Sequence, residues 1–215
     1  MLLLGLIVEA TSKSTLPAYV TTHFLNPLGM HQTYYEVPES QYEHCTANEF
    51  SVSKSALGRS QPIRGVVHDE KAYLLRSSGA GHAGVFSTIG DMKRLCDMLA
   101  AKGKYNGTSV LQESTFDLAL VDYNSQLTGK PTEPPKTASH GLGFELNQPW
   151  YMGEMTEFDC FGHTGFTGTS IIITREIASF LIILTNRTHP TRESGQVNKL
   201  REECATVFKK FLRHK

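Results

Sequence analysis

The clearest hydrophobic pattern lies near the end of the chain, where two apolar segments follow one another closely. Residues 171–174 and 180–185 are rich in Ile and Leu, and a short link containing Arg175 and Glu176 separates them. Runs of this length and composition are typical of strands, and so short a link favours an antiparallel hairpin. A third strand is expected around His163, before a bend that contains glycines.

Apolar residues at helical spacing predict helices at the start of the chain. Residues 1–10 are mostly apolar and predict an opening helix. A second helix is expected after the polar break at 12–15, because Pro17 suits a first helical turn. We expect this helix to end at Asn26-Pro27. Its apolar face is predicted to consist of Leu16, Val20 and Phe24, with Leu25 and Leu28 alongside.

Two later helices carry their own boundary signals. Thr88 is a candidate N-cap with Asp91 three residues on, and Gly103 a candidate C-cap. The predicted face of that helix is Met92, Leu95, Cys96 and Leu99. A final helix is expected from about Gln196, with cationic residues near its end, where they suit the helix dipole. Its predicted apolar face is Val197, Leu200, Cys204, Val207, Phe208 and Phe211.

The segments between these elements are less regular. Residues 34–75 show little periodicity and are expected to be irregular, and residues 124–139 are expected to form a loop that contains three prolines. A short helix is expected over 111–120, and the sheet is expected to start at 141–146. The pattern predicts an α+β protein, with helices packed on an antiparallel sheet. We interpret residues 1–215 as one domain, with helices and loops in 1–140 and the sheet strands and last helix in 141–215.

Composition excludes several classes of function. Lys and Arg together number 21, as do Asp and Glu, so the chain has no excess of positive charge that would favour binding to nucleic acid or to an anionic membrane. The four cysteines are widely spaced, without the pairs typical of a zinc site, and we expect no metal and no cofactor. No run is long enough to span a membrane. The first ten residues lack a basic leader and are interrupted by Glu9, so they do not resemble a signal peptide, and the compartment stays open.

The glycine-rich bend carries the most informative candidate site. Gly162, Gly165 and Gly168 allow the backbone to approach a ligand closely. His163 and Thr164 lie among them, with further hydroxyl side chains nearby. We therefore predict that this strand is the edge of an active site.

Two other segments invite a chemical interpretation. Residues 77–88 contain three glycines but lack the Gly-Lys-Ser/Thr of a phosphate-binding loop. His82, which lies among these glycines, is a candidate for substrate contact. His68, Asp69 and Glu70 could suggest a metal site, but consecutive side chains rarely converge on one ion, so we interpret them as a loop.

Four segments together resemble the serine β-lactamase and penicillin-binding-protein superfamily. His163-Thr164-Gly165 is similar to its third motif, and residues 27–33 match its "PLGM-x-x-T" segment. Residues 80–88 match a third recurrent segment, and a "VHD" loop like that at 67–69 borders the substrate cleft in relatives. The resemblance runs from residue 1 to the last helix. It implies a β-lactamase/transpeptidase-like fold whose N-terminal part is missing from this chain.

The resemblance also implies a reaction, acyl transfer on a β-lactam, a D-Ala peptide or an ester. In such enzymes a Ser attacks a carbonyl group and a Lys three residues later takes its proton. The resemblance implies that His163 supports this network, that Thr164 and Gly165 line the cleft, and that the N–H of Phe166 completes an oxyanion hole. The implied partner is a small-molecule or peptidoglycan-like substrate.

The nucleophile motifs of the superfamily do not occur at their expected places. The only Ser-x-x-Lys is Ser51 to Lys54, which follows the "PLGM" segment instead of preceding it, and we interpret it as a coincidence. No Tyr-x-Asn occurs in the chain. We therefore interpret the chain as the C-terminal part of a serine hydrolase, inactive as given. Three alternatives stay open: a fragment of an active hydrolase, a non-catalytic binding or interaction protein, and a structural module that uses its sheet edge.

Overall fold

The computed structural model describes residues 1–50, 59, 62–76, 79–128, 139–193, 195 and 197–212. They form two compact units. The first consists of Met1–Arg94 and Asn186–Ser194, and the second of Leu95–Thr185 and Gly195–Lys215. The division falls within helix α5 (Ile89–Ala100). The organisation as one domain, with a change of character near residue 140, stays a prediction.

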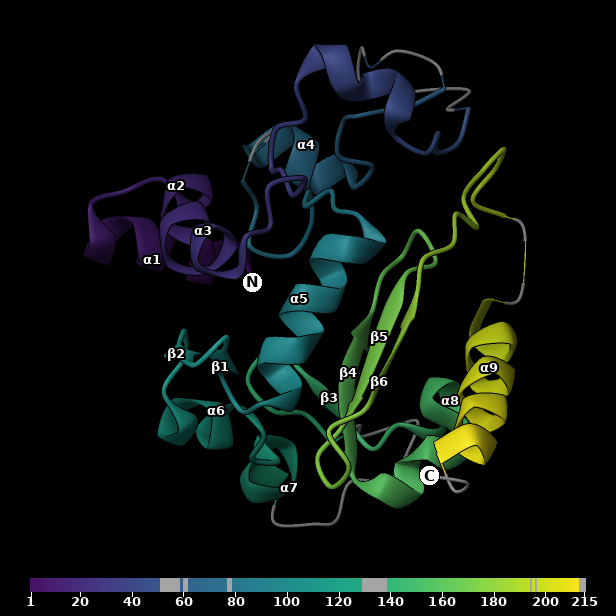
Figure 1. Cartoon of the computed structure of the whole chain (residues 1–215). Helices are drawn as coiled ribbons and strands as arrows, with labels where there is room; N and C mark the ends of the chain where they lie inside the picture. Colours follow the sequence, from purple (N-terminus) through teal and green to yellow (C-terminus); the bar gives the residue numbers. More distant parts are fainter. Residues whose placement is uncertain are drawn as a thin grey trace. The chain divides into compact units, whose positions relative to one another are not determined.

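The second unit is built on a four-stranded antiparallel sheet in the order β3-β4-β5-β6 (Figure 1). The strands are β3 (Glu145–Leu146), β4 (Cys160–Thr164), β5 (Ser170–Thr174) and β6 (Phe180–Ile183). In β4, His163 pairs with Ile171 and Thr164 with Ser170. The antiparallel sheet and the two consecutive hairpins confirm the α+β expectation.

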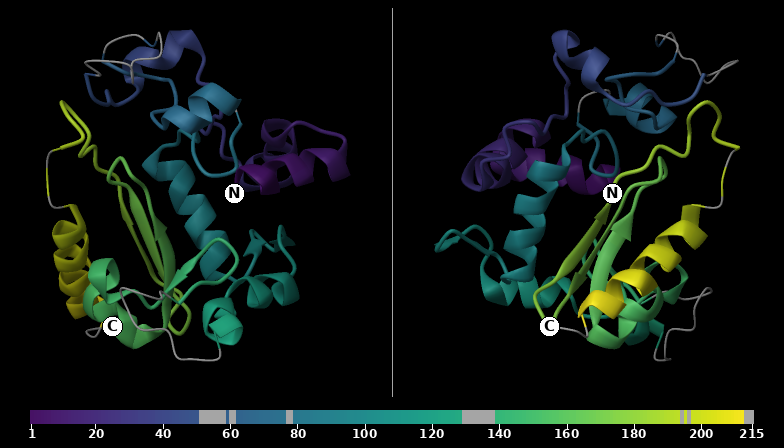
Figure 2. Two further views of the ribbon diagram at one scale, coloured as in Figure 1. Left: turned by 180° about the vertical axis from the view of Figure 1, so that it is seen from behind. Right: turned by 45° about the vertical axis from the view of Figure 1, so that its right-hand side comes forward.

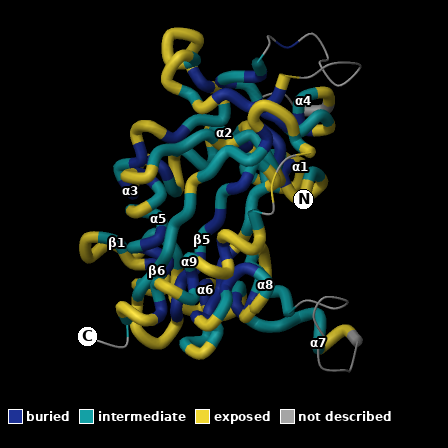
Figure 3. The backbone as a smooth tube through the Cα atoms, turned by 90° about the vertical axis from the view of Figure 1, so that its right-hand side faces the viewer, coloured by how far each residue is buried: buried dark blue, intermediate teal, exposed yellow. Residues whose placement is uncertain are grey.

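Helices cover one face of this sheet (Figures 1 and 2). They are α8 (Pro149–Met152), the 3₁₀ helix η4 (Gly153–Phe158) and α9 (Val197–Leu212). Their apolar side chains share a core with alternate residues of β4 and β5, because successive side chains of a strand point to opposite faces. Most of β5 is accordingly coloured as buried in Figure 3. The buried members are Tyr151, Met152, Met155, Cys160, Ile172 and Ala205.

The opposite face of β4 contacts a second group of aromatic side chains. Phe161, 1% exposed, packs edge-to-face against Phe116 and Phe144, with ring centroids 5.7 and 5.2 Å away. Phe116 belongs to α6 (Glu113–Ala119), which confirms the helix expected over 111–120. The same unit contains a small hairpin, β1 (Lys104–Tyr105) with β2 (Thr108–Ser109), and helix α7 (Tyr123–Thr128).

The first unit opens with the predicted helices. Helix α1 (Leu2–Ser12) is followed by α2 (Leu16–Val20). Thr15 caps the first turn of α2, because its side chain accepts a hydrogen bond from the Ala18 N–H at 3.3 Å. A 3₁₀ helix, η2 (Glu39–His44), and α4 (Glu70–Arg76) follow. Helix α5 begins as expected, because Thr88 caps it by accepting from the Asp91 N–H at 3.3 Å. No helix among the described residues is both long and apolar enough to cross a bilayer.

The expected end of the second helix at Asn26-Pro27 is wrong. The chain stays helical through a π-helical turn, η1 (Thr21–Leu25), and α3 (Asn26–Leu28), and ends at Gly29 with φ 67°. In that turn the Asn26 N–H bonds to the Thr21 carbonyl, five residues back. The wider turn accommodates the ring of Pro27, which would otherwise clash with the carbonyl four residues before it.

Two segments expected to be irregular contain helices. Helix α4 starts within 34–75, where the side chain of Asp69 accepts a hydrogen bond from the Ala72 N–H at 2.7 Å. Helix α7 lies in the first part of the loop expected over 124–139, and its first turn is held by Asp122, which accepts from the N–H groups of Asn124 and Ser125. In both cases a capping aspartate starts a helix too short to show periodicity.

The last helix is correctly located, but its predicted apolar face is only partly right: Phe208 packs against the core, whereas three of the predicted residues are exposed. Leu200, Val207 and Phe211 are 45%, 51% and 66% exposed, whereas Arg201 and Lys209 are 3% and 2% exposed. Both cations have partners that offset the cost of burial. Arg201 hydrogen-bonds to the turn after β4, and Lys209 forms ion pairs with Glu154 and Glu157.

Candidate active site

The predicted active-site strand ends with an exposed imidazole. Phe161 and Gly162 of β4 are buried, whereas His163 is exposed. Strand alternation places His163 on the same side as Phe161, opposite the core that includes Cys160 and α9. The Nδ1 of His163 lies 2.8 Å from the Thr164 carbonyl oxygen. Because a carbonyl can only accept, Nδ1 is the donor in this contact, and Nε2 is the nitrogen that does not take part in it.

The turn after β4 is closed by its own backbone. The Gly165 N–H donates to the Thr169 carbonyl at 2.7 Å, and the Gly168 N–H donates to the Gly165 carbonyl at 3.0 Å. The hydroxyl of Thr185 also donates to the Gly168 carbonyl at 2.8 Å. Phe166 projects from this turn with 57% of its surface exposed. Thr164, Gly165 and Phe166 therefore follow His163 on one ordered, accessible hairpin end.

Arg201 of helix α9 hydrogen-bonds to this turn. Its Nη2 donates to the carbonyl oxygens of Gly165 at 2.9 Å and Thr169 at 2.8 Å. Its Nη1 donates to Oδ1 of Asn198 at 2.8 Å. Sequence reasoning missed this residue, because a lone arginine in an amphipathic helix normally belongs to the solvated face.

A buried tyrosine lies in the core of the same unit. Burial, reinforced by the charge of Glu145, raises the pKa of Tyr151 far above its ordinary value. Its side chain is fully buried, so the phenol stays protonated at any physiological pH. Tyr151 is thus a core residue.

His82 belongs to the first unit, whereas His163, Thr164, Gly165 and Phe166 belong to the second. Its Nε2 is 3.2 Å from Oδ1 of Asp69. Burial acts to raise the pKa of Asp69, but hydrogen bonds from the Ala72 N–H and from His82 outweigh it and lower that pKa. His82 therefore has a structural partner, and its contact with substrate stays a prediction.

The neighbours of Asp69 also have separate partners. Nε2 of His68 lies 3.2 Å from Oε1 of Glu49, and Glu70 forms an ion pair with Arg192. Within the described part of the chain, no three His, Cys, Asp or Glu side chains come together as a metal site would require. Ser51 to Lys54, the only Ser-x-x-Lys of the sequence, lies outside the described residues.

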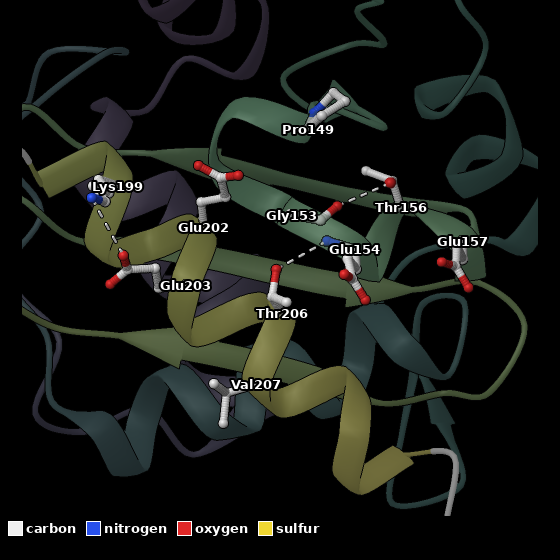
Figure 4. Close-up of a pocket in the computed structure, with 10 residues that line it drawn as sticks. All are labelled: Pro149, Gly153, Glu154, Thr156, Glu157, Lys199, Glu202, Glu203, Thr206 and Val207. Atoms are coloured by element: carbon white, nitrogen blue, oxygen red, sulfur yellow. Dashed lines mark hydrogen bonds and ion pairs between the residues drawn. The ribbon is translucent and has the colours of Figure 1, made fainter.

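The second unit also contains a groove. It has a volume of about 600 Å³ and lies between the α8–η4 segment and α9 (Figure 4). Its charged lining is mainly acidic, and Lys199 lies 3.8 Å from Glu203. None of the predicted site residues lines it. The carboxylates that line it are Glu154, Glu157, Glu202 and Glu203.

Comparison with known proteins agrees with the resemblance read from the motifs. The family model described as beta-lactamase matches residues 1–205. An N-acetylmuramyl-L-alanine amidase of Bacillus subtilis is 30% identical over 200 residues, which are 87% of this chain and 43% of the relative. A putative D-alanyl-D-alanine carboxypeptidase of Salmonella schwarzengrund is 28% identical over 211 residues, 92% of this chain and 46% of the relative.

A solved structure is similar to this chain in fold. A penicillin-binding protein homologue from Pyrococcus abyssi superposes with a TM-score of 0.62 at 17% identity, covering 96% of this chain and 40% of that protein. The chain spans less than half the length of both sequence relatives. Because the family model matches nearly its whole length, the chain belongs to the β-lactamase family.

Proposed function

We propose that the hairpin end from His163 to Phe166 is the substrate-facing strand of a β-lactamase-like acyl-transfer site. The observation that supports this most is the exposed imidazole of His163 at the end of an otherwise buried strand, directly before an ordered turn. A site of this kind needs an accessible proton-handling group on a rigid support. The proposed substrate class is a β-lactam, a D-Ala peptide or an ester.

The chemistry of such a site requires two things of this strand. When a nucleophile attacks a carbonyl carbon, negative charge develops on the carbonyl oxygen, and a backbone N–H aimed at that oxygen stabilises it. Phe166 would supply this N–H. Because Nδ1 of His163 donates to the Thr164 carbonyl, Nε2 of the neutral ring is left to accept a hydrogen bond or a proton. We therefore propose a neutral role for His163 beside the nucleophile.

The substrate class has additional support from the relatives. The names of the two similar proteins describe an amidase of N-acetylmuramyl-L-alanine and a putative D-alanyl-D-alanine carboxypeptidase. Both names refer to amide bonds next to alanine. A short peptide that ends in D-Ala is therefore the first substrate to test.

A second candidate is a binding protein that keeps the cleft without turnover. The only Ser-x-x-Lys, at Ser51 to Lys54, follows the "PLGM" segment, and no Tyr-x-Asn occurs in the sequence. On this basis we propose that residues 1–215 do not themselves hydrolyse β-lactams or esters. Incubation with a chromogenic cephalosporin and a p-nitrophenyl ester checks this. Turnover clearly above that of His163→Ala would contradict it.

Ligand binding tests the proposed site independently of turnover. We would titrate the ¹⁵N-labelled chain with D-Ala-D-Ala and, as a matched control, with L-Ala-L-Ala. The proposal predicts saturable shifts of the amide resonances of residues 163–168 with the D-dipeptide, strongly weakened in His163→Ala. Shifts confined to other parts of the chain, or none, would argue against the site.

In a form of the protein that also carries the nucleophile motifs, a pH–rate profile tests the role of His163. A neutral imidazole that accepts a hydrogen bond predicts a rate that rises with pH across the range in which histidine loses its proton. His163→Lys and His163→Gln should both lack this acid limb. An unchanged limb in the two variants would show that another group titrates.

A further inference from the structure

The peptide unit between Gly165 and Phe166 is held at its carbonyl end by a buried guanidinium. Nη2 of Arg201 donates to the Gly165 carbonyl at 2.9 Å. The only cis peptide bond among the described residues is His189-Pro190, so this peptide is trans. In a trans peptide the C=O and the following N–H point in opposite directions. The N–H of Phe166 therefore points away from Arg201.

We propose that Arg201 is a positioning residue that sets the orientation of the Phe166 N–H. This inference rests on the proposed function, in which that N–H stabilises the developing negative charge on the substrate. Arg201 touches neither substrate nor nucleophile and acts only through the peptide plane. The residue is 3% exposed, which leaves its guanidinium little freedom to move away from the turn.

The geometry of the contact explains why the residue is an arginine. One Nη2 reaches two carbonyls of the same turn, those of Gly165 and Thr169, while Nη1 bonds to Asn198 on the previous turn of the helix. A planar fork of donors makes all three contacts at once. A lysine ammonium, which is a point charge on a flexible stem, would not hold the same plane.

The contact also affects the strength of the donor. Both carbonyls already accept one backbone hydrogen bond, from the Gly168 and Gly165 N–H groups. The turn therefore keeps its backbone hydrogen bonds without Arg201. A charged donor on the Gly165 carbonyl polarises the whole peptide unit, and linked hydrogen bonds strengthen one another. Arg201 thus makes the Phe166 N–H a stronger donor.

The simpler alternative is that Arg201 only fastens α9 to the hairpin. Lys209 is the matched control, because it is also a buried cation of α9 but pairs with Glu154 and Glu157 of η4. Replacing Lys209 removes a comparable buried contact of the same helix without touching the turn. A purely mechanical role predicts the same outcome for both cations.

The test is the amide resonance of Phe166 in the ¹⁵N-labelled full chain. We expect Arg201→Ala and Arg201→Lys to move this resonance, whereas Lys209→Ala lowers the Tm and leaves the resonance in place. Millimolar guanidinium should return the resonance of Arg201→Ala towards its wild-type position. If Arg201→Ala unfolds, Arg201→Lys carries the comparison alone.

Two outcomes would overturn the proposal. One is a Phe166 resonance that stays in place in both Arg201 variants. The other concerns binding of D-Ala-D-Ala at residues 163–168, which we expect to be on the order of tenfold weaker in Arg201→Lys than in the wild type. Equal affinities of the two proteins would contradict the proposal. A wild-type chain that binds no dipeptide, but whose Phe166 resonance depends on Arg201, would contradict the proposed function alone and leave the positioning geometry supported.

Discussion

Arg192 and Glu49, which are 143 positions apart in the sequence, form an ion pair that involves both carboxylate oxygens of Glu49. Nε of Arg192 lies 3.0 Å from Oε1 and 2.9 Å from Oε2 of Glu49, and the backbone N–H of Arg192 donates to Oε2 at 3.2 Å. The Glu49 side chain is 6% exposed, and Glu70 binds the same guanidinium. The segment that follows β6 is therefore anchored to the first unit.

This pair predicts a loss of stability in acid. The hydrogen bond from Arg192 overcomes burial and lowers the pKa of Glu49 to about 2, from 4.5. A lowered carboxyl pKa stabilises the fold fully above pH 4.5, and this contribution is lost as the pH falls from 4.5 to about 2. Urea unfolding followed at several pH values measures this. In Glu49→Gln the slope in that window should largely disappear, and an unchanged slope would assign it to other groups.

His68 should cause a further loss of stability, which begins at a higher pH than the loss due to Glu49. Burial lowers the pKa of His68, although Glu49 opposes this. A lowered histidine pKa means that the unfolded chain takes up the proton first, so stability is full above pH 6.5 and falls as the pH drops below it. His68→Gln should flatten the curve just below pH 6.5 without affecting the window below pH 4.5. A curve identical to the wild type would contradict this assignment.

The cost of breaking the Glu49 pair should exceed that of a surface pair. Glu49→Gln removes one of the two carboxylates that bind Arg192 and leaves Glu70 on the guanidinium. We expect about 2 kcal/mol of lost stability, below the range for fully buried pairs because Arg192 is 35% exposed. The control is Glu113→Gln, which removes a pair with Lys102 in which both side chains are about half exposed. We expect its change to be below about 1 kcal/mol. Equal losses for the two variants would be inconsistent with this ranking.

Removing the carboxylates that pair with Lys209 should destabilise the protein more than removing Lys209 itself. Its side chain is 3% exposed, whereas those of Glu154 and Glu157 are 57% and 51% exposed. The double variant Glu154→Gln, Glu157→Gln leaves a buried charge uncompensated and should cost about 2 to 4 kcal/mol. Lys209→Met leaves only solvated carboxylates and should cost less than about 1 kcal/mol. Thermal and urea unfolding compare them, and the reverse order would refute this account.

Two glycines of the site should respond differently to alanine. A Cβ on Gly162 would lie 2.0 Å from the Ile171 carbonyl oxygen, which is backbone, whereas a Cβ on Gly165 would lie 2.3 Å from the Thr169 hydroxyl. Gly162→Ala must separate β4 from β5 and should cost about 3 kcal/mol. Gly165→Ala should cost less, and Thr169→Ala should relieve much of that cost, because it removes the clashing oxygen.

The outer strand β6 predicts self-association. It ends the order of the described sheet, and its sequence is Phe180–Ile183. An apolar edge strand presents unpaired backbone groups to other chains. We expect concentration-dependent dimers or aggregates in sedimentation, reduced by Ile182→Lys, because an edge lysine opposes pairing. A monodisperse monomer with a sharp thermal transition would contradict this expectation.

Local signals in the sequence were sufficient for much of the fold. The β5–β6 hairpin followed from two apolar runs and a short link, and the start of α5 from Thr88 as its cap. The short helices α4 and α7 could not be predicted from periodicity, because seven and six residues make fewer than two turns. Their capping aspartates, Asp69 and Asp122, were the available signals.

The sequence by itself determined the family, the antiparallel strands and the position of His163 before a glycine-rich turn, because these depend on local composition and short motifs. Only the tertiary structure decided which face of α9 is buried and how the turn is held. Hydropathy counts Arg201 and Lys209 as solvent-exposed, but their charges find acceptors on segments more than 30 residues away. Burial of a cation depends on such partners, and partners distant in sequence are set only by folding.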